Sequence, residues 1–335
     1  MNLFELTREL IQIESVTGHE KNAALFLGDY LSSLGYSVTL QEAAADRLNV
    51  LALAGRPDLI FTTHIDTVPP YVPYREDSDF IYGRGACDAK GIIAAQVEAA
   101  NRLRSEGENR IGLLFVVGEE RDSAGAIYAA SLPPGSRCFI NGEPTENRLV
   151  SGSKGSLRVE IQARGKAAHS AYPEMGESAI LKLLDILADI RAMPLPSDPV
   201  LGDSTCNIGV LSGGVKANVI PDSARAEIMF RSVEEISLLR ERLEHLVAGR
   251  ADIIPMFEVP VTMMNTAEGF DTAPVSFASD VPFLTSLGAA YMIGPGSILD
   301  AHTDHERISK QQQLEGVELY IRLAKQLLEA FADGK

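Results

Sequence analysis

Short, continuous runs of apolar residues separated by helical segments constrain this chain more than any other feature of its sequence. The runs cover residues 37–40, 49–54, 59–63, 111–117 and 138–140. A helix is predicted at 91–103, between the third and fourth runs. Strands without apolar and polar alternation are buried on both faces, as in sheets that helices cover on both sides. The first part of the chain is therefore predicted to form an α/β domain.

A helix start signal precedes the first of these runs. Thr17 and Glu20 have the spacing of a capping box, in which each side chain bonds the backbone of the other residue. The pattern predicts a helix from this point to about Gly35.

From Lys154 the pattern changes to strands that alternate apolar and polar residues. The expected elements are a strand around 157–161, a helix at 178–190, strands at 207–211 and 224–230, a helix at 236–247 and a strand near 253–261. This β-α-β-β-α-β order is typical of a ferredoxin-like α+β unit. We expect residues 154–264 to form an inserted domain, and residues 1–153 and 265–335 to form one discontinuous domain. The segment 280–335 is expected to contain a helix, a strand and a second helix.

Composition excludes several classes of function. The chain has 30 Lys and Arg against 46 Asp and Glu, a net charge of −16, which argues against nucleic-acid binding. No apolar run approaches the ~18 residues of a membrane span, and the N-terminus lacks the features of a signal peptide. We expect a soluble, cytoplasmic protein with no membrane partner. The three cysteines form neither a disulfide framework nor a thiolate metal site, and we interpret them as buried residues.

Ionisable residues follow the expected strands at their carboxyl ends. They are His64 and Asp66 after 59–63, Glu119 and Glu120 after 111–117, and Glu143 after 138–140, with Asp88 just before the helix at 91–103. In an open α/β sheet such strand ends converge and bind ligands. Polar strand ends are also common without any function. Several carboxylates gathered at one edge would repel one another unless a cation lay among them, and histidine with carboxylate suits zinc.

Five motifs in a fixed order connect these residues to a known family. They are Thr63-His64-Ile65-Asp66-Thr67-Val68-Pro69, Gly83-Arg84-Gly85-Ala86-Cys87-Asp88-Ala89-Lys90-Gly91, Gly118-Glu119-Glu120, Gly142-Glu143-Pro144-Thr145 and Ala301-His302-Thr303-Asp304-His305-Glu306. Together they resemble the signature of the dinuclear zinc amidohydrolases and exopeptidases, which include acetylornithine deacetylase, succinyl-diaminopimelate desuccinylase and aminoacylase. The segments 207–218 and 294–296 look most similar to the acetylornithine and acetylcitrulline deacetylase branch.

The resemblance implies a fold and a set of metal ligands. The fold would be a zinc-exopeptidase-like catalytic domain with a mixed sheet, into which a ferredoxin-like dimerisation or lid domain is inserted. Two zinc ions are implied, with cobalt or manganese as substitutes. The implied ligands are Asp88 as the bridge, His64 and Glu143 for one ion, and Glu120 and His302, rather than His305, for the other.

Further residues receive roles from the same resemblance. Glu119 would be the general base, and Asp66 would hold the free ring N–H of His64. On an extended segment Glu119 and Glu120 point in opposite directions, which fits two separate roles. His169 would reach across a dimer interface to stabilise the oxyanion. Asn218 and Arg231 are paired on the α-carboxylate of the substrate.

The expected function is that of a homodimeric two-zinc hydrolase of amino-acid biosynthesis that cleaves the amide of an N-acyl amino acid, such as N-acetylornithine. A dipeptidase or carboxypeptidase on the same scaffold, acting on short peptides, is the first alternative, because both activities need the same metals and the same carboxylate contacts. A catalytically silent amino-acid-binding protein is the alternative from another class. It predicts a broken ligand set or a missing base, and the sequence shows neither.

Overall fold

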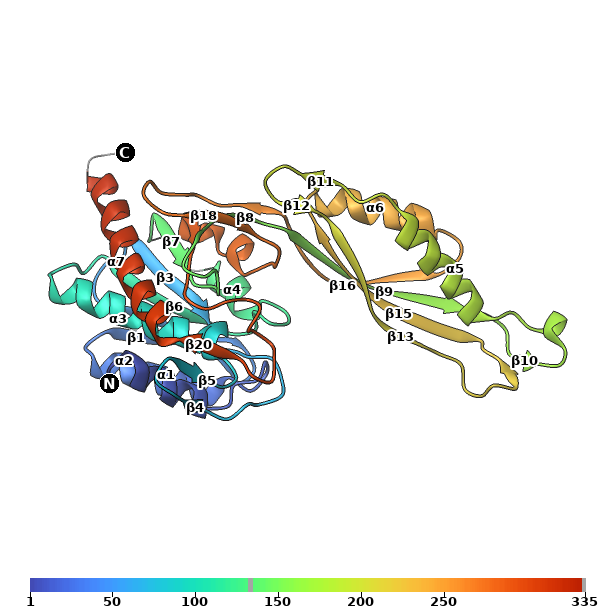
Figure 1. Ribbon diagram of the computed structural model, residues 1–335, viewed down its shortest axis with the longest axis horizontal. Coiled ribbons are helices and arrows are strands. Elements are labelled where there is room, and N and C mark those ends of the chain that lie inside the picture. Colours follow the sequence, from blue (N-terminus) through green and yellow to red (C-terminus); the bar gives the residue numbers. More distant parts are fainter. Residues whose placement is uncertain (132–134, 333–335) are drawn as a thin grey trace. The chain divides into compact units, whose positions relative to one another are not determined.

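The computed structural model describes residues 1–131 and 135–332, and the chain divides into two compact units (Figure 1). Unit 1 comprises Met1–Ser151, Met264–Ala273 and Asp280–Lys335. Unit 2 comprises Gly152–Met263 and the short segment Pro274–Ser279. Unit 2 is thus inserted into unit 1, and the chain crosses between them four times.

A six-stranded mixed sheet forms the centre of unit 1, in the order β1-β2-β6-β3-β7-β19. Its strands are β1 (Ser37–Ala44), β2 (Arg47–Leu53), β3 (Leu59–His64), β6 (Ile111–Val116), β7 (Cys138–Asn141) and β19 (Ala289–Met292). β3 runs parallel to β6 and β7, and β19 runs parallel to β7. β2 pairs antiparallel with β6, and β1 pairs antiparallel with β2. Every residue of β3 and β6 is buried, so both faces are covered at the centre of the sheet. The expected burial of the run at 37–40 is wrong, because this run lies on the edge strand β1 and none of its residues is fully buried. The predicted α/β class and mixed sheet are confirmed.

Helices bury the faces of this sheet, and α3 packs against α7. They are α1 (Leu3–Gln12), α2 (Lys21–Ser33), α3 (Gly91–Ser105), α4 (Ala124–Ala129) and α7 (Lys310–Ala332). A π-helical turn, Ala86–Lys90, precedes α3, and a second sheet contains β4 (Arg75–Glu76), β5 (Phe80–Tyr82) and β20 (Arg307–Ser309). In the described part of the chain, no helix has both the length and the apolar character that a membrane crossing needs.

Unit 2 contains a four-stranded antiparallel sheet in the order β13-β15-β9-β16. The strands are β9 (Gly155–Arg164), β13 (Thr205–Gly213), β15 (Ser223–Ser232) and β16 (Asp252–Val259), and the helices are α5 (Ala179–Ala192) and α6 (Ile236–Val247). Burial alternates along β15, because one sheet face packs on the helices. The predicted β-α-β-β-α-β order is confirmed.

Smaller elements complete unit 2 and its connections. Two of them form a short ladder near one end of the main sheet, where β10 (Ala168–His169) pairs with β14 (Val219–Ile220). The others are a 3-10 turn (Pro173–Met175), the pair β11 (Ser197–Asp198) and β12 (Gly202–Asp203), and a sheet of β17 (Thr262–Met263), β8 (Leu149–Ser153) and β18 (Thr272–Val275).

Two expectations about local structure are wrong. The capping box at Thr17 and Glu20 does not form, because Thr17 donates to Asp66 and Glu20 pairs with Arg47, both across the fold. The capping box that does form joins Asn2 and Glu5 at the start of α1. The helix expected near the start of 280–335 is instead two 3-10 turns, Val281–Phe283 and Thr285–Leu287.

The packing of β3 on α7 gives a stability prediction. The Phe61 ring is fully buried, and its centroid lies 5.4 Å from that of Tyr320. We expect Phe61→Ala to lower the free energy of unfolding by about 3–5 kcal/mol, because it removes a large side chain from a close-packed core. Leu314→Ala, at an exposed position of the same helix, should change it by less than about 1 kcal/mol. Denaturant unfolding curves test both, and equal losses would contradict this account of the core.

Candidate metal centre

The site residues of unit 1 come together because β3, β6 and β7 run parallel and end at the same edge of the sheet. His64 is the last residue of β3, Glu119 and Glu120 follow β6, and Glu143 follows β7. Asp88 lies in the turn before α3. Residues far apart in sequence therefore meet at this edge, as the strand pattern predicts.

Two groups of ligand atoms share Asp88. In each group all donor atoms lie within 4.8 Å of one another: the first contains His64, Asp88 and Glu143, and the second contains Asp88, Glu120 and His302. Asp88 Oδ1 lies 2.9 Å from His64 Nε2, and its Oδ2 lies 3.2 Å from His302 Nε2. The two oxygens of one carboxylate thus face two different histidines, which is the arrangement that a bridging carboxylate needs. His302 Nε2 also lies 2.9 Å from Glu120 Oε1.

Two ionisable residues close in sequence to these ligands, Glu119 and His305, lie outside both groups. Glu119, next to Glu120, belongs to neither group, and the same holds for His305, whose exposed ring bonds Asp304. The two glutamates are therefore placed differently, although they follow one another on a turn after β6 and not on an extended segment.

Asp66 is fully buried, and its carboxylate organises the segment that follows β6. Its Oδ1 accepts hydrogen bonds from the backbone N–H groups of Gly118 at 2.9 Å and Glu119 at 3.1 Å. Its Oδ2 accepts from the Glu120 N–H at 3.2 Å and the Thr17 hydroxyl at 2.7 Å. Burial raises the pKa of Asp66, but the contact with His64 and its charge, together with the bonds from the Thr17 hydroxyl and the Glu120 N–H, hold the pKa below its usual value.

The expected contact between Asp66 and His64 is only partly as we predicted. His64 Nδ1 lies 2.9 Å from the Asp66 backbone oxygen and 3.5 Å from its carboxylate. The nearer acceptor is thus the carbonyl, because the carboxylate is engaged by the loop after β6. Either acceptor orients the ring so that Nε2 faces Asp88.

Glu306 holds the segment that carries Asp88. Its Oε1 accepts from the backbone N–H groups of Cys87 and Asp88, each at 3.2 Å, and its Oε2 accepts from Arg84 at 2.6 Å. Both side chains of the ion pair are buried. Asn141 has a similar relation to Glu143, since its amide nitrogen donates to Glu143 Oε1 at 3.2 Å. Hydrogen bonds from neighbouring residues therefore orient the backbone at Asp88 and the side chain of Glu143.

The electrostatics of the centre fit a bound cation. Burial, together with the charge of Asp88, raises the pKa of Glu143 to about 8, although His64 opposes it. Burial also raises the pKa of Asp280 to about 7. Hydrogen bonds to Asp88 and Glu120 raise the pKa of His302 to about 10. Without a cation Glu143 and His302 retain protons near neutral pH, and a metal ion bound to them would displace those protons. Histidine nitrogen and carboxylate oxygen are donors that suit zinc, manganese or cobalt.

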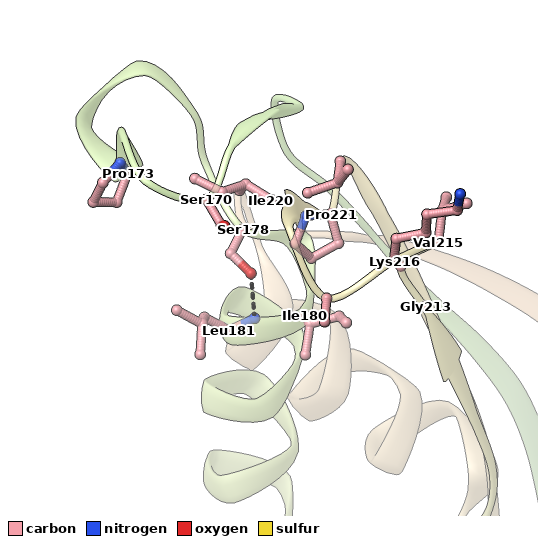
Figure 2. A pocket seen from close by; sticks show the side chains of 13 residues that line it. Ser170, Pro173, Ser178, Ile180, Leu181, Gly213, Val215, Lys216, Ile220 and Pro221 are labelled. Atoms are coloured by element: carbon pink, nitrogen blue, oxygen red, sulfur yellow. Dashed lines mark hydrogen bonds between the residues drawn. The ribbon is translucent and has the colours of Figure 1, made fainter.

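The three expected site residues of unit 2 do not all come together. His169 lies on β10 opposite Val219, and the Ser170 N–H donates to the Asn218 carbonyl at 3.1 Å, so His169 and Asn218 are neighbours. The residues beside them, including Ser170, Ala217 and Val219, line a pocket of about 740 Å³ (Figure 2).

Arg231 lies at the other end of the same sheet. β13 pairs with β15, and the pair nearest Asn218 in sequence is Gly213 with Ala224. Arg231 lies on β15 seven residues beyond Ala224, where it pairs with Thr205. Seven residues of strand span about 23 Å. Within one chain, Arg231 and Asn218 therefore cannot bind the same carboxylate.

Several residues that shape the centre were not found from the sequence. Arg84 and Glu306 lie inside recognised motifs, which could have drawn attention to them. The others lie outside every motif: Thr17, Glu20, Arg47, Asn141 and Asp280. They act through contacts between segments remote in sequence, for which local patterns give no signal.

Comparisons with known proteins agree with this geometry. The family model described as Peptidase family M20/M25/M40 matches residues 60–326. A peptidase M20 domain-containing protein of Schizosaccharomyces pombe is 40% identical over 335 residues, which cover 96% of this chain and 84% of that protein. A probable carboxypeptidase of Aspergillus terreus is 39% identical over 364 residues, which cover 94% of this chain and 84% of that protein. The structure of a tripeptidase from Staphylococcus aureus matches at a TM-score of 0.78 and 23% identity, covering 96% of each chain.

The fold and the site define a metal-dependent peptidase or amidohydrolase. The chain belongs to peptidase family M20/M25/M40. The predicted relationship to the two-metal hydrolases is thereby confirmed. The narrower expectation, a place in the acetylornithine deacetylase branch, stays a prediction, since the relatives carry the names of peptidases and carboxypeptidases.

The shared position of Asp88 predicts an asymmetry among metal-site variants. We expect the protein to bind two zinc ions per chain, and Glu143→Ala to weaken one of the two sites. Asp88→Ala should weaken both sites, because both groups contain its carboxylate. Asp304→Ala, an exposed acid near His302, is the control and should bind two ions. Zinc titration of chelator-treated protein measures this, and equal losses from the Asp88 and Glu143 variants would contradict a shared ligand.

Proposed function

We propose that this protein is a two-metal carboxypeptidase or dipeptidase, which hydrolyses the amide bond preceding a residue with a free α-carboxylate. The observation that carries the proposal is the position of Asp88, whose two oxygens face His64 and His302. The names of relatives at 35–40% identity support a peptide rather than an acetylated amino acid as substrate.

His64, Asp88 and Glu143 would hold one metal ion, and Asp88, Glu120 and His302 the other. The bound metals would supply a Lewis acid that polarises the scissile carbonyl and favours deprotonation of the attacking water. In the proposed reaction Glu119 accepts the proton of that water and passes it to the leaving amine nitrogen. Its backbone N–H is held by Asp66, which limits the positions that its side chain can reach.

Unit 2 would provide recognition of the substrate. We assign Arg231 to the α-carboxylate, because a guanidinium binds a carboxylate through two parallel hydrogen bonds. His169 would donate a hydrogen bond to the oxyanion of the tetrahedral intermediate. Because Asn218 is a neighbour of His169 and about 23 Å of strand separates it from Arg231, we propose that His169 and Asn218 enter the site of a second subunit.

A homodimer is therefore part of the proposal. β13 is an edge strand of its sheet, and edge strands are open to pairing with another chain. Leu211 on this strand is 56% exposed, and Leu181 on α5 is 63% exposed. Figure 2 shows Leu181 beside the pocket whose rim includes the neighbours of His169 and Asn218. Such apolar exposure beside an open edge favours contact with a second copy.

An N-acyl amino acid deacetylase, with N-acetylornithine as an example, is the second candidate. The segments 207–218 and 294–296 favour it, since they resemble the deacetylase branch. Both candidates require the same metal ligands, the same general base and a free α-carboxylate, and they differ only in the group on the acyl side.

A panel of substrates tests the proposal. With zinc-loaded protein, we expect blocked and free dipeptides to be hydrolysed with a higher kcat/KM than acetylated amino acids. Amidation of the α-carboxylate should lower kcat/KM by about 100-fold or more, because Arg231 would lose its partner. Arg231→Ala should lower kcat/KM by a similar factor for substrates with a free α-carboxylate. In this variant, amidation of the substrate should then have little further effect on kcat/KM.

Arg225→Ala is the matched control, because Arg225 lies on the same strand and on the same face as Arg231. It should change kcat/KM less than about 3-fold. A preference for acetylated amino acids would favour the second candidate. Indifference to the carboxylate would contradict both candidates, and no hydrolysis of any amide in the panel would contradict the proposed class of reaction.

The arrangement of the subunits gives a separate prediction. Glu119→Gln and His169→Ala should each lose most activity. A mixture of the two variants with exchanged subunits should regain part of it, because one site of each heterodimer then contains both an intact Glu119 and an intact His169. His169→Ala mixed with Asn218→Ala should regain none, because both groups come from the same chain. Activity after mixing, with subunit exchange verified by labelled chains, distinguishes these outcomes. A monomer in solution, or recovery in both mixtures, would contradict the shared site.

A further inference from the structure

An ion triad of Glu20, Arg47 and Asp122 lies beside the loop that carries Glu119 and Glu120, and the proposed reaction does not use it. Arg47, the first residue of β2, donates to Glu20 through Nε at 3.1 Å and Nη2 at 2.9 Å. Its Nη1 donates to the two oxygens of Asp122 at 3.2 and 3.0 Å. One guanidinium thus joins the segment before α2 to the segment after β6.

The triad is largely removed from water. The side chain of Arg47 is 7% exposed, Glu20 is 0% exposed, and Asp122 is 37% exposed. Buried ion pairs lose much more than exposed ones when one partner is removed, because the other charge stays desolvated. Loss of Arg47 would leave the buried Glu20 carboxylate without its guanidinium partner, and Asp122 with Arg121 alone, in a region that already contains Asp66 and Asp280.

The guanidinium also packs against the backbone of the loop after β6, residues Gly118 to Ser123. A Cβ atom built on Gly118 would lie 2.3 Å from Arg47 Nη2 and 2.5 Å from Asp122 Oδ1, so only glycine fits. Gly118 has a φ of 86°, a value that favours glycine. Its carbonyl accepts from the N–H groups of Asp122 at 2.9 Å and Ser123 at 2.7 Å. The two ends of the loop therefore close on each other against Arg47.

The loop is consequently held from two sides. On one side, the Asp66 carboxylate binds the N–H groups of Gly118, Glu119 and Glu120. On the other side, Arg47 binds the Asp122 carboxylate and packs on Gly118. Fixing both sides restrains the backbone of Glu119 and Glu120, and with it the direction in which their Cα–Cβ bonds point.

We propose that Arg47 is a positioning residue that acts through Asp122 and Gly118 to set the orientation of the Glu119 and Glu120 side chains. The part of this inference that concerns Glu119 rests on the proposed function. The part that concerns Glu120 does not require any substrate, because it concerns metal binding by the second group.

Arg121 provides a matched control for Arg47. It donates to the same carboxylate, with Nη2 3.0 Å from Asp122 Oδ2, but its side chain is 56% exposed and adjacent to Asp122 in sequence. Replacing it removes a guanidinium from Asp122 without disturbing the buried contacts to Glu20 and Gly118. Any effect specific to Arg47 therefore reflects its buried position.

The test compares Arg47→Met with Arg121→Met in the full-length protein. For Arg47→Met we expect kcat to fall at least about 10-fold, with KM changed less than about 3-fold. The affinity of one of the two zinc sites, the group that contains Glu120, should fall about 10-fold or more, as for residues that orient metal ligands. Arg121→Met should change each quantity less than about 2-fold. Zinc affinity is measured by titration of the metal-free protein against a competing chelator.

A double-mutant cycle separates positioning from a general loss of stability. The cycle is measured at saturating zinc, so that the weaker metal binding expected through Glu120 does not limit kcat. If Arg47 acts through Glu119, Arg47→Met should then lower the residual kcat of Glu119→Gln less than about 3-fold, because the group that it orients is already gone. Asp122→Asn should reproduce the kcat loss of Arg47→Met, and the two changes together should cost little more than either.

Three outcomes would overturn the inference: normal kcat and zinc affinity in folded Arg47→Met, equal losses in Arg121→Met, or additive losses with Glu119→Gln. If Arg47→Met does not fold, Arg47→Lys replaces it, because lysine keeps the charge but cannot bridge both acids. The same losses are then expected, and wild-type values would overturn the inference. A wild type inactive on the substrate panel would contradict the proposed function alone, while the zinc titrations would still test Arg47.

Discussion

The arrangement of the candidate metal centre depends on one buried carboxylate, that of Asp66. It accepts three successive backbone N–H groups, from Gly118 to Glu120, and the hydroxyl of Thr17. A buried carboxylate with this many donors stays ionised, and the lowered pKa of Asp66 agrees. Because Asp66 follows β3 and the donors follow β6, this single group joins the two strand ends that contribute ligands from His64 and Glu120.

Charge balance is the second constraint on this edge of the sheet. Buried acids outnumber the buried cations near them, and burial raises the pKa of both Glu143 and Asp280. The fold compensates part of this charge with Arg47 and Arg84, each of which is paired and almost fully buried. Part of the remaining charge lies on the two groups that share Asp88, where divalent cations would complete the balance.

Unit 2 shows how strand register restricts function. Its antiparallel pairing puts His169 and Asn218 at one end of the sheet and Arg231 at the other. A substrate smaller than the length of the sheet cannot contact both ends of one copy. In the proposed homodimer, the open edge of β13 and the exposed leucines near the pocket would be the surface through which a second copy supplies the other end.

The sequence by itself determined the strands that are buried on both faces, the β-α-β-β-α-β order of unit 2, and the ionisable residues that follow the strands. These follow from local patterns of apolar residues and from motifs that stay within a few positions of one another. Only the tertiary structure decided the partners of Thr17 and Glu20, which are Asp66 and Arg47 in place of a local cap. It also decided the separation of Asn218 from Arg231. Buried charges choose partners by proximity in the packed fold, and strand register accumulates over many residues, so neither is encoded in a local pattern.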